Sequence, residues 1–299
     1  MHMRFATYLS YGHPRPAVVG DDDIIDLELA CQILQAEHLI PSGAAPQSLL
    51  ALIRLEQAGI DLVEAVLAHR AYLARACRPI ASVRFAAPIP HPPHVYCVAS
   101  NYIPLKAEQV RLQRSPAFYS KDPNTVIGPG DAIRLHPELT DEVDYEAELA
   151  VVIGRKVSNV GPDQAARAVF GYTCLNDVTA RDVMRRPKKW LLGKNLDTFC
   201  PTGPVVVHCS ELPWPPSCGV IARVNGEIRQ FAEIADLVFD IPTLISYLSV
   251  SQPLEWGDIV ATGTPFGVGA DLRPPRFLRP GDRVEVEVTG VGRLANPCV

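Results

Sequence analysis

Two glutamates separated by a single residue give the sequence its first sign of chemistry. Glu146 and Glu148 lie in the segment 144–154, which reads DYEAELAVVIG. On a helix two such residues would point to different sides, whereas on a strand they share one face. Two carboxylates held together raise each other's pKa unless a cation lies between them. Oxygen ligands with no His or Cys nearby suit Mg²⁺, Mn²⁺ or Ca²⁺, but a solvated strand face beside a core face explains the same spacing equally well.

Three further segments carry polar side chains at the ends of predicted strands. Residues 171–182 read as a strand that ends in a polar turn, and Asp177 lies where the strand stops. Lys194 lies among apolar and small residues of segment 190–201. A partly enclosed lysine can pair with a substrate carboxylate or oxyanion, although an ordinary surface lysine fits the same pattern. Residues 262–269, TGTPFGVG, form a glycine-rich loop that lacks the Gly-Lys-Ser/Thr ending of a phosphate-binding loop.

The elements that must position these residues are mostly short strands. The 28 prolines and 20 glycines disfavour a helical bundle and suit strands joined by turns. Residues 3–29 read as a small β unit, and residues 46–75 as a helical stretch in which Gly59 separates two helices. Two further short helices are expected over residues 162–170 and 241–249.

A cluster of prolines divides the chain. Five prolines stand between residues 79 and 93, and each one fixes φ and biases its predecessor toward an extended conformation. The sequence therefore predicts a small N-terminal α/β domain over residues 1–78, a proline-rich linker over 79–93 and a catalytic domain over 94–299.

The composition excludes several classes of protein. Of the 299 residues, 47% are hydrophobic and 20% charged, a mixture typical of soluble globular proteins. The net charge of −5 and the lack of a basic block disfavour nucleic acid and anionic membranes as partners. The apolar runs are far shorter than the roughly 20 residues of a membrane span, and the N-terminus has no apolar stretch for a secretory signal. The eight cysteines form no C-x-x-C pair, which favours reduced thiols and a cytoplasmic location.

Together these segments resemble the fumarylacetoacetate hydrolase family. The matching strings follow the family's order from about residue 95 onward: DYEAELAVVIGR, GYTCLNDVTARD, GKNLDTFCPTGPVV, VNGEIRQ, LEWGDIVATGTPFGVG and FLRPGD. The N-terminal part is similar to the small domain of longer bacterial members, including oxaloacetate decarboxylase-type enzymes. The resemblance implies an α+β, β-rich fold, with a mixed β-sheet roll in the catalytic domain, and a homodimer.

The resemblance also implies roles for individual residues. Glu146, Glu148 and Asp177 match the family's ligands of Mg²⁺ or Mn²⁺. Lys194 matches its substrate-contacting lysine, and Thr264 matches a residue that contacts the substrate's carboxylate end. A 2-oxo carboxylate can chelate such a cation, which stabilises the enolate formed when a neighbouring C–C or C–H bond breaks. Arg181 and Asp182, the end of the TARD string, are expected to pair with each other or to brace the turn that carries the aspartate.

Two positions depart from the family pattern. The family's N-Y-x-x-H-x-x-E segment reads NYIPLKAE here, so Glu108 is kept but Leu105 replaces the histidine. Leucine cannot take a proton, so the usual His–Glu dyad cannot form. Met184 stands where relatives often have a glutamine that contacts substrate. Both changes remove polarity from the expected pocket and favour a substrate bulkier or more apolar than oxaloacetate.

Three functions are compatible with these residues. The preferred one is metal-dependent cleavage of a C–C bond in a 2-oxo carboxylate, by acylpyruvate or diketo-acid hydrolysis or by oxaloacetate-type decarboxylation. Glu108 or a metal-bound water would then do the proton work, with Lys194 contacting the substrate. The first alternative is a keto–enol tautomerase or isomerase, which needs the enolate but no activated water. The second is a metal- or ligand-binding relative without catalysis, and the retained acidic residues and Lys194 disfavour it.

Overall fold

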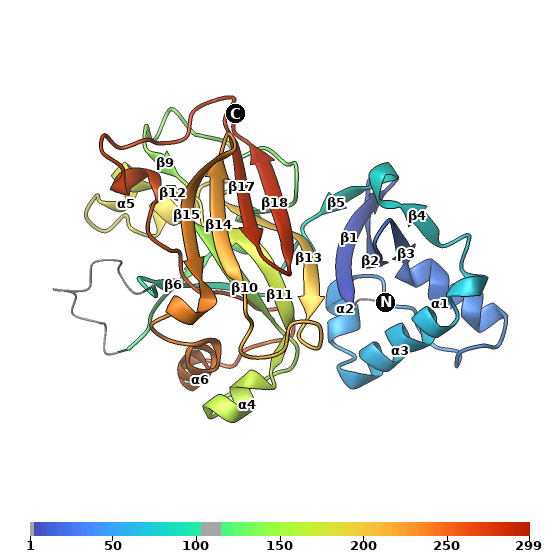
Figure 1. Ribbon diagram of the computed structural model, residues 1–299. Helices are drawn as coiled ribbons and strands as arrows, with labels where there is room; N and C mark the ends of the chain where they lie inside the picture. Colours follow the sequence, from blue (N-terminus) through green and yellow to red (C-terminus); the bar gives the residue numbers. More distant parts are fainter. Residues whose placement is uncertain (1–2, 103–114) are drawn as a thin grey trace.

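The computed structural model describes residues 3–102 and 115–299 and has a small N-terminal lobe (residues 3–86) beside a larger body (residues 95–102 and 115–299) (Figure 1). Most of the regular structure is strand, and parallel and antiparallel pairs occur together, which confirms the predicted α+β, β-rich fold. None of the described helices is long and apolar enough to cross a membrane. All eight cysteines lie in described parts of the chain and are free thiols.

The N-terminal lobe is a small sheet with helices packed against it. Strands β1 and β2 form a hairpin that β3 and β4 extend, and β5 pairs with β1. Phe5, Ile25 and Leu34 are fully buried in the core of this lobe. Its elements are β1 (Arg4–Ser10), β2 (His13–Val19), β3 (Asp23–Asp26), α1 (Leu27–Ala36), α2 (Leu49–Ile53), α3 (Gln57–Ala68), β4 (Cys77–Pro79) and β5 (Arg84–Ala86).

Two predictions for this lobe are wrong in detail. The expected β unit runs into helix α1, because the Asp26 side chain accepts a hydrogen bond from the Leu29 N–H and so caps a new helix. Gly59 lies inside α3 rather than between two helices, and the break precedes it. A Cβ at Gly59 would lie 2.5 Å from the Leu52 carbonyl oxygen, so the glycine is needed for the close approach of α2 and α3.

One sheet of twelve strands runs through both lobes, in the order β4-β3-β2-β1-β13-β11-β10-β16-β6-β7, with β5 paired to β1 and β8 to β13. Arg4 of β1 lies opposite Val207 of β13, so backbone hydrogen bonds join the N-terminal lobe to the body. Every residue of β10 and β11 is buried. The strands that the body contributes are β6 (Val95–Ala99), β7 (Ala117–Lys121), β8 (Val126–Ile127), β10 (Ala147–Ile153), β11 (Val169–Asn176), β13 (Cys200–His208) and β16 (Ile259–Ala261).

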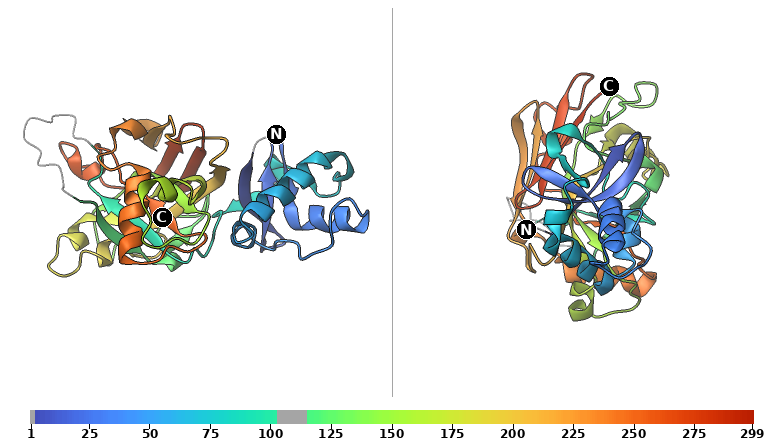
Figure 2. Two further views of the ribbon diagram at one scale, coloured as in Figure 1. Left: turned by 90° about the horizontal axis from the view of Figure 1, so that it is seen from below. Right: turned by 90° about the vertical axis from the view of Figure 1, so that its right-hand side faces the viewer.

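A second sheet, in the order β15-β14-β17-β18, contacts β10 and β11. Leu149 of β10, Val220 of β14 and Val286 of β17 belong to one buried apolar cluster. Figure 2 shows from a second direction that the body and the N-terminal lobe lie side by side. The remaining strands are β9 (Val143–Asp144), β12 (Thr179–Ala180), β14 (Gly219–Val224), β15 (Glu227–Glu233), β17 (Arg283–Val288) and β18 (Gly292–Pro297).

Helices are few in the body, as expected. Helix α6 (Ile241–Ser251) confirms the helix predicted over 241–249. Helix α4 (Pro162–Ala166) is shorter than predicted, because strand β11 already begins at Val169. The other helices in the described part of the body are α5 (Arg181–Met184) and the 3₁₀ helices η4 (Pro123–Thr125), η5 (Leu192–Lys194), η6 (Ile234–Asp236) and η7 (Gly269–Asp271). The N-terminal lobe has the 3₁₀ helices η1 (Arg70–Tyr72) and η2 (Ile80–Ser82).

The proposed domain boundaries at residues 78 and 93 stay a prediction. The proline-rich segment between them contains η2 and β5, and β5 is hydrogen-bonded to β1. The segment is therefore partly ordered as regular structure, and one sheet continues from the N-terminal lobe into the body.

Candidate active site

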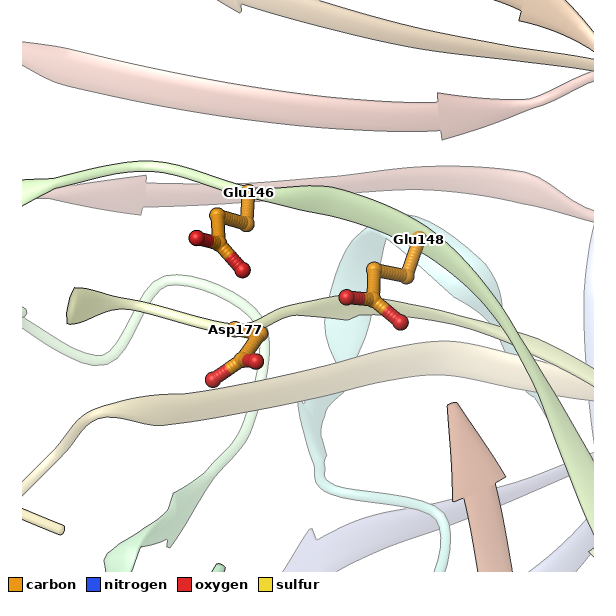
Figure 3. A group of neighbouring side chains, drawn as sticks. All are labelled: Glu146, Glu148 and Asp177. Carbon is orange, nitrogen blue, oxygen red and sulfur yellow. The ribbon is translucent and has the colours of Figure 1, made fainter. Parts of the chain in front are cut away.

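Three carboxylates meet where strands β10 and β11 lie side by side. Glu148 is in β10, Glu146 directly precedes that strand, and Asp177 directly follows β11. The antiparallel register sets Ala147 opposite Asn176, so the beginning of one strand meets the end of the other. One oxygen of each carboxylate lies within 4.8 Å of the others, and Figure 3 shows the three side chains facing a common space.

The sequence predicts one continuous strand for the segment that carries the two glutamates. The structure shows that this prediction is wrong. Strand β9 ends at Asp144 and β10 begins at Ala147. Between them the Glu146 N–H donates to Asn176 Oδ1 over 3.0 Å, and the Ala147 N–H donates to Gln230 Oε1 over 3.0 Å. These side-chain acceptors satisfy the backbone at the interruption, and the two glutamate carboxylates stay together.

Three cationic side chains lie against this acidic cluster. Lys194 Nζ is 2.8 Å from Glu146 Oε2 and 2.8 Å from Asp177 Oδ2. Lys121 Nζ is 2.6 Å from Asp177 Oδ1, and Arg181 Nη1 is 2.6 Å from Glu146 Oε1. Both lysines are buried. The negative charge of the cluster is therefore largely matched by fixed positive charge.

The nearby cations have different effects on the pKa values of Asp177 and Glu148. Burial would raise the pKa of Asp177, but the charges and hydrogen bonds of Lys121 and Lys194 outweigh it and hold this pKa below its usual value. Glu148 has the opposite balance. Burial, followed by the charges of Asp177 and Glu146, raises the pKa of Glu148 well above its usual range.

One oxygen of Glu148 has room for a further partner. Glu148 Oε2 accepts a hydrogen bond from the Gly263 N–H at 2.7 Å. Glu148 Oε1 is buried and has no hydrogen-bond partner within residues 3–102 and 115–299. Leaving a buried carboxylate oxygen unpaired is costly, and a bound cation would remove that cost. Because the cluster is all carboxylate, it could hold a hard divalent cation such as Mg²⁺ or Mn²⁺.

Arg181 joins Glu146 to a fourth carboxylate, Asp144, whose Oδ2 lies 2.8 Å from the arginine Nε. The structure does not show the expected pair with Asp182, which instead lies 3.2 Å from Arg186 Nη2. The side-chain partners of Arg181 lie on the glutamate segment and not on the turn that carries Asp177, so bracing of that turn stays a prediction. Arg181 Nη2 is buried and, among the described residues, has no hydrogen-bond partner.

Tyr119 is a further residue of the site that sequence reasoning missed. Its hydroxyl donates to Asp177 Oδ2, and Lys194 Nζ lies 5.0 Å from its ring centroid. Burial, and then the charge of Asp177, raise the pKa of Tyr119 well above its usual value, so the hydroxyl keeps its proton. The Trp190 ring meets it edge-on, with 4.6 Å between centroids. Tyr119 and Lys121 are two residues apart on β7, so their side chains share one face of the strand. Nothing in the sequence of this strand alone indicates a site.

A cavity of about 710 Å³ opens beside the acidic cluster. The residues that line it include Glu146, Arg181 and Lys194. Thr264 and Met184, both predicted to contact substrate, line the same cavity. Glu146, Arg181, Lys194 and Thr264, which come from four separate segments of the sequence, therefore share one space.

Two predicted site residues, Leu105 and Glu108, lie outside the described residues. Their roles, and that of Thr264 toward a substrate, stay predictions. The Thr264 hydroxyl donates to the Ala147 carbonyl at 3.0 Å and lies 2.9 Å from Gln230 Nε2, which donates to it. The structure thus accounts for Thr264 as a contact between the glycine-rich loop and the start of β10.

Comparison with known sequences adds two findings. The family model described as fumarylacetoacetate (FAA) hydrolase C-terminal matches residues 94–299. Oxaloacetate tautomerase YisK of Bacillus subtilis (strain 168) is 39% identical over 299 residues, which covers 98% of this chain and 99% of that protein. The similarity to this relative therefore includes the N-terminal lobe.

Two solved structures are similar over nearly the whole chain. Fumarylacetoacetate hydrolase (EaFAH) from psychrophilic Exiguobacterium antarcticum is 32% identical, with a TM-score of 0.81 and 99% of each chain covered. Maleylpyruvate hydrolase from Sphingobium sp. SYK-6, in complex with manganese (II) ion and pyruvate, is 31% identical, with a TM-score of 0.77 and 99% of each chain covered. The named reactions of these relatives differ, but the family model matches more than half of the chain, and the chain therefore belongs to the fumarylacetoacetate hydrolase family.

Proposed function

We propose that the chain is a divalent-metal-dependent keto–enol tautomerase of 2-oxo carboxylates, with Glu146, Glu148 and Asp177 as ligands of Mg²⁺ or Mn²⁺. The observation that carries this proposal is the convergence of the three carboxylates within 4.8 Å. The manganese (II) ion and pyruvate held by the similar maleylpyruvate hydrolase support both the cation and the substrate class.

A cation bound to these carboxylates would supply Lewis-acid stabilisation of the negative charge that develops on the keto oxygen of a 2-oxo acid. Lys194 would add a fixed positive charge beside it. Burial would lower the pKa of Lys194, but the charges of Asp177 and Glu146 outweigh this effect and raise it, so the ammonium stays charged. The unpaired Nη2 of Arg181 would donate to the substrate carboxylate.

The proton step distinguishes tautomerisation from cleavage. Tautomerisation moves one proton between carbon and oxygen and consumes no water. Glu108 is the proposed base for this transfer, whereas Leu105 leaves no His–Glu dyad to activate a water for hydrolysis. Tautomerisation therefore becomes the first candidate, ahead of the C–C cleavage that the sequence favoured. The similarity to the B. subtilis oxaloacetate tautomerase over nearly the whole chain supports this order.

Cleavage of a C–C bond stays as the second candidate, by acylpyruvate hydrolysis or oxaloacetate-type decarboxylation. The likeness to maleylpyruvate hydrolase supports it. Both reactions develop negative charge on the same keto oxygen, so one site could serve either. Hydrolysis would then require a replacement for histidine as the water-activating base, whereas decarboxylation releases CO₂ and requires only a proton donor for the enolate.

The test follows enol decay, acylpyruvate cleavage and oxaloacetate decarboxylation side by side, with Mg²⁺ or Mn²⁺ and with chelator. Metal-dependent enol decay without cleavage is the expected result. Glu146→Ala should abolish both metal binding and enol decay, whereas Glu285→Gln should leave both intact, because Glu285 pairs with arginines on the second sheet. Metal-dependent cleavage faster than enol decay would make the second candidate the function. Tight metal binding without any turnover would instead indicate a binding protein.

The assembly and location of the chain are also proposals. We infer a homodimer and a cytoplasmic protein, without nucleic acid or membrane partners. The eight free thiols, most of them buried, support a reducing compartment. Sedimentation equilibrium that gives the mass of a single chain would contradict the homodimer.

A further inference from the structure

The cavity beside the acidic cluster is lined by two kinds of side chain. A few are charged, among them Glu146, Lys194 and Arg181. Most of the others are apolar, and the apolar wall of the cavity is made of Val98, Met184, Trp190, Val238 and Phe266. A pocket in which a few polar groups face a larger apolar wall is typical of a ligand with a charged end and an apolar end.

Two aromatic side chains of this wall remain partly open to solvent. Trp190 is 38% exposed and Phe266 is 46% exposed. The edge contact with Tyr119 holds the Trp190 ring next to the residue that donates to Asp177. Large apolar side chains exposed in a concave site gain free energy when a ligand covers them.

The charged residues that line the cavity disfavour a substrate that carries a second carboxylate. Among the described residues that line it, the cations are Lys194 and Arg181, and both already contact Glu146. The other charged residue of the lining is Asp271, an exposed carboxylate. A distal carboxylate would thus exchange water for an apolar wall and a like charge.

We propose that the preferred substrate is a 2-oxo acid whose distal substituent is apolar and aromatic, with Trp190 and Phe266 as the specificity-determining residues. The inference rests on the proposed tautomerase function and narrows its substrate to one class. The 2-oxo carboxylate end lies against the acidic cluster and its cations. The apolar end lies against these aromatic side chains in place of the second carboxylate that oxaloacetate carries.

The first experiment compares the enol forms of phenylpyruvate and oxaloacetate as substrates of the Mn²⁺-loaded protein. The kcat/KM for phenylpyruvate should exceed that for oxaloacetate by about tenfold or more, the scale that one well-matched apolar contact provides. An equal or higher kcat/KM for oxaloacetate would overturn the proposal.

Variants of the wall assign the preference to its residues. Trp190→Ala and Phe266→Ala should each raise KM for phenylpyruvate by about tenfold and change KM for oxaloacetate less than twofold. Phe231→Ala is the matched control, because Phe231 is an exposed phenylalanine (58%) on β15 that is not part of the cavity lining. Equal losses for both substrates in the wall variants would show a general structural effect and contradict the assignment.

A binding measurement separates this inference from the proposed function. Calorimetry with phenylpyruvate and with 2-oxoglutarate, a stable 2-oxo dicarboxylate, reports the preference without turnover. Tighter binding of phenylpyruvate, lost in Trp190→Ala, would uphold the inference even if no enol decay were seen and the tautomerase function failed. Tighter binding of 2-oxoglutarate would overturn the inference and leave the tautomerase function standing.

Discussion

Asp26 in the N-terminal lobe and Glu148 at the candidate active site are both buried carboxylates, yet their oxygens have different partners. Asp26 accepts hydrogen bonds from the Tyr8 hydroxyl at 2.6 Å, Arg15 Nε at 2.7 Å and the Leu29 N–H at 2.9 Å. Burial alone would raise the pKa of Asp26, but these bonds outweigh it and lower the pKa. Glu148 has an oxygen with no partner among the described residues, and its pKa is raised.

This difference distinguishes a carboxylate that stabilises the folded chain from one that is available to bind a ligand. A buried charge with all of its hydrogen bonds made contributes to stability, and removing it leaves its partners unpaired. A buried carboxylate that has no partner for one of its oxygens costs stability until a ligand completes it. Glu148 is of the second kind, so substitutions at the two positions should have opposite consequences.

Replacing Glu148 should have the largest effect. Glu148→Gln keeps the shape of the side chain but removes one charged ligand, and Mn²⁺ affinity should fall about a thousandfold, or about 4 kcal/mol. Without metal, the variant should be at least as stable as the wild type, because burial and the charges of Asp177 and Glu146 already disfavour the ionised form of Glu148. Calorimetric titration with Mn²⁺ and urea unfolding with chelator measure the two quantities. Unchanged affinity would remove Glu148 from the metal site.

Replacing Asp26 should act on stability and not on metal binding. Asp26→Asn weakens the charge-assisted hydrogen bonds from Arg15 and Tyr8, although Arg15 keeps Glu28 at 3.3 Å, and should lower the free energy of unfolding by about 2 kcal/mol near pH 7. Mn²⁺ affinity should equal that of the wild type. A large loss of affinity in this variant would mean that the two lobes are coupled, and the comparison would fail.

The pH dependence of this loss has a definite sign. Because the pKa of Asp26 is lower in the folded chain than in the unfolded chain, its contribution is complete above the unfolded pKa of about 3.9 and is lost as pH falls through the folded pKa. The stability difference between wild type and Asp26→Asn should therefore shrink below about pH 4. Urea unfolding at a series of pH values would reveal a constant difference if the prediction were wrong.

Binding of Mn²⁺ at Glu148 should raise the free energy of unfolding. At a free Mn²⁺ concentration one hundred times the Kd, the folded state should gain about 2.7 kcal/mol. The gain should persist in Asp26→Asn and vanish in Glu148→Gln. Thermal unfolding with and without Mn²⁺ measures it, and an equal rise in Tm for both variants would point to a metal site elsewhere.

The smallest effects are expected from two tyrosines that donate to these clusters. Tyr8→Phe removes one hydrogen bond to Asp26 and should cost about 1 kcal/mol of stability. Tyr119→Phe removes the hydroxyl that holds Asp177 and should weaken Mn²⁺ binding about tenfold. Each variant is the control for the other, and the electron paramagnetic resonance spectrum of bound Mn²⁺ should change only in Tyr119→Phe.

The acidic cluster could be predicted because its signals are local. Glu146 and Glu148 share a side because of the two-residue period of extended chain, and Asp177 follows directly on a strand of buried residues. Their meeting depends on the pairing of β10 with β11, which no local pattern specifies. The family resemblance supplied that step, and the structure brings the three carboxylates together as it implied.

The rest of the site could not be predicted, because tertiary placement makes it. Lys121 and Tyr119 lie on β7, which pairs with β6 at the edge of the large sheet, and only the folded chain brings them to Asp177. Helix α1 was missed for a related reason. Asp26 ends an acidic stretch that resembles a hairpin turn, and its role as a helix cap appears only from its bond to the Leu29 N–H.

The pairing of β1 with β13 has a consequence for the synthesis of the chain. Strand β1 can pair with β13 only after Val207, the partner of Arg4, has been synthesised and has left the ribosome. Until then Arg4 and Phe5 at this edge of β1 are unpaired, because β5 covers only Thr7 to Leu9 of it, and unpaired strand edges invite pairing with other chains. Premature termination before residue 200 would leave the edge open permanently, so truncated products of this gene should aggregate rather than accumulate as a free N-terminal lobe.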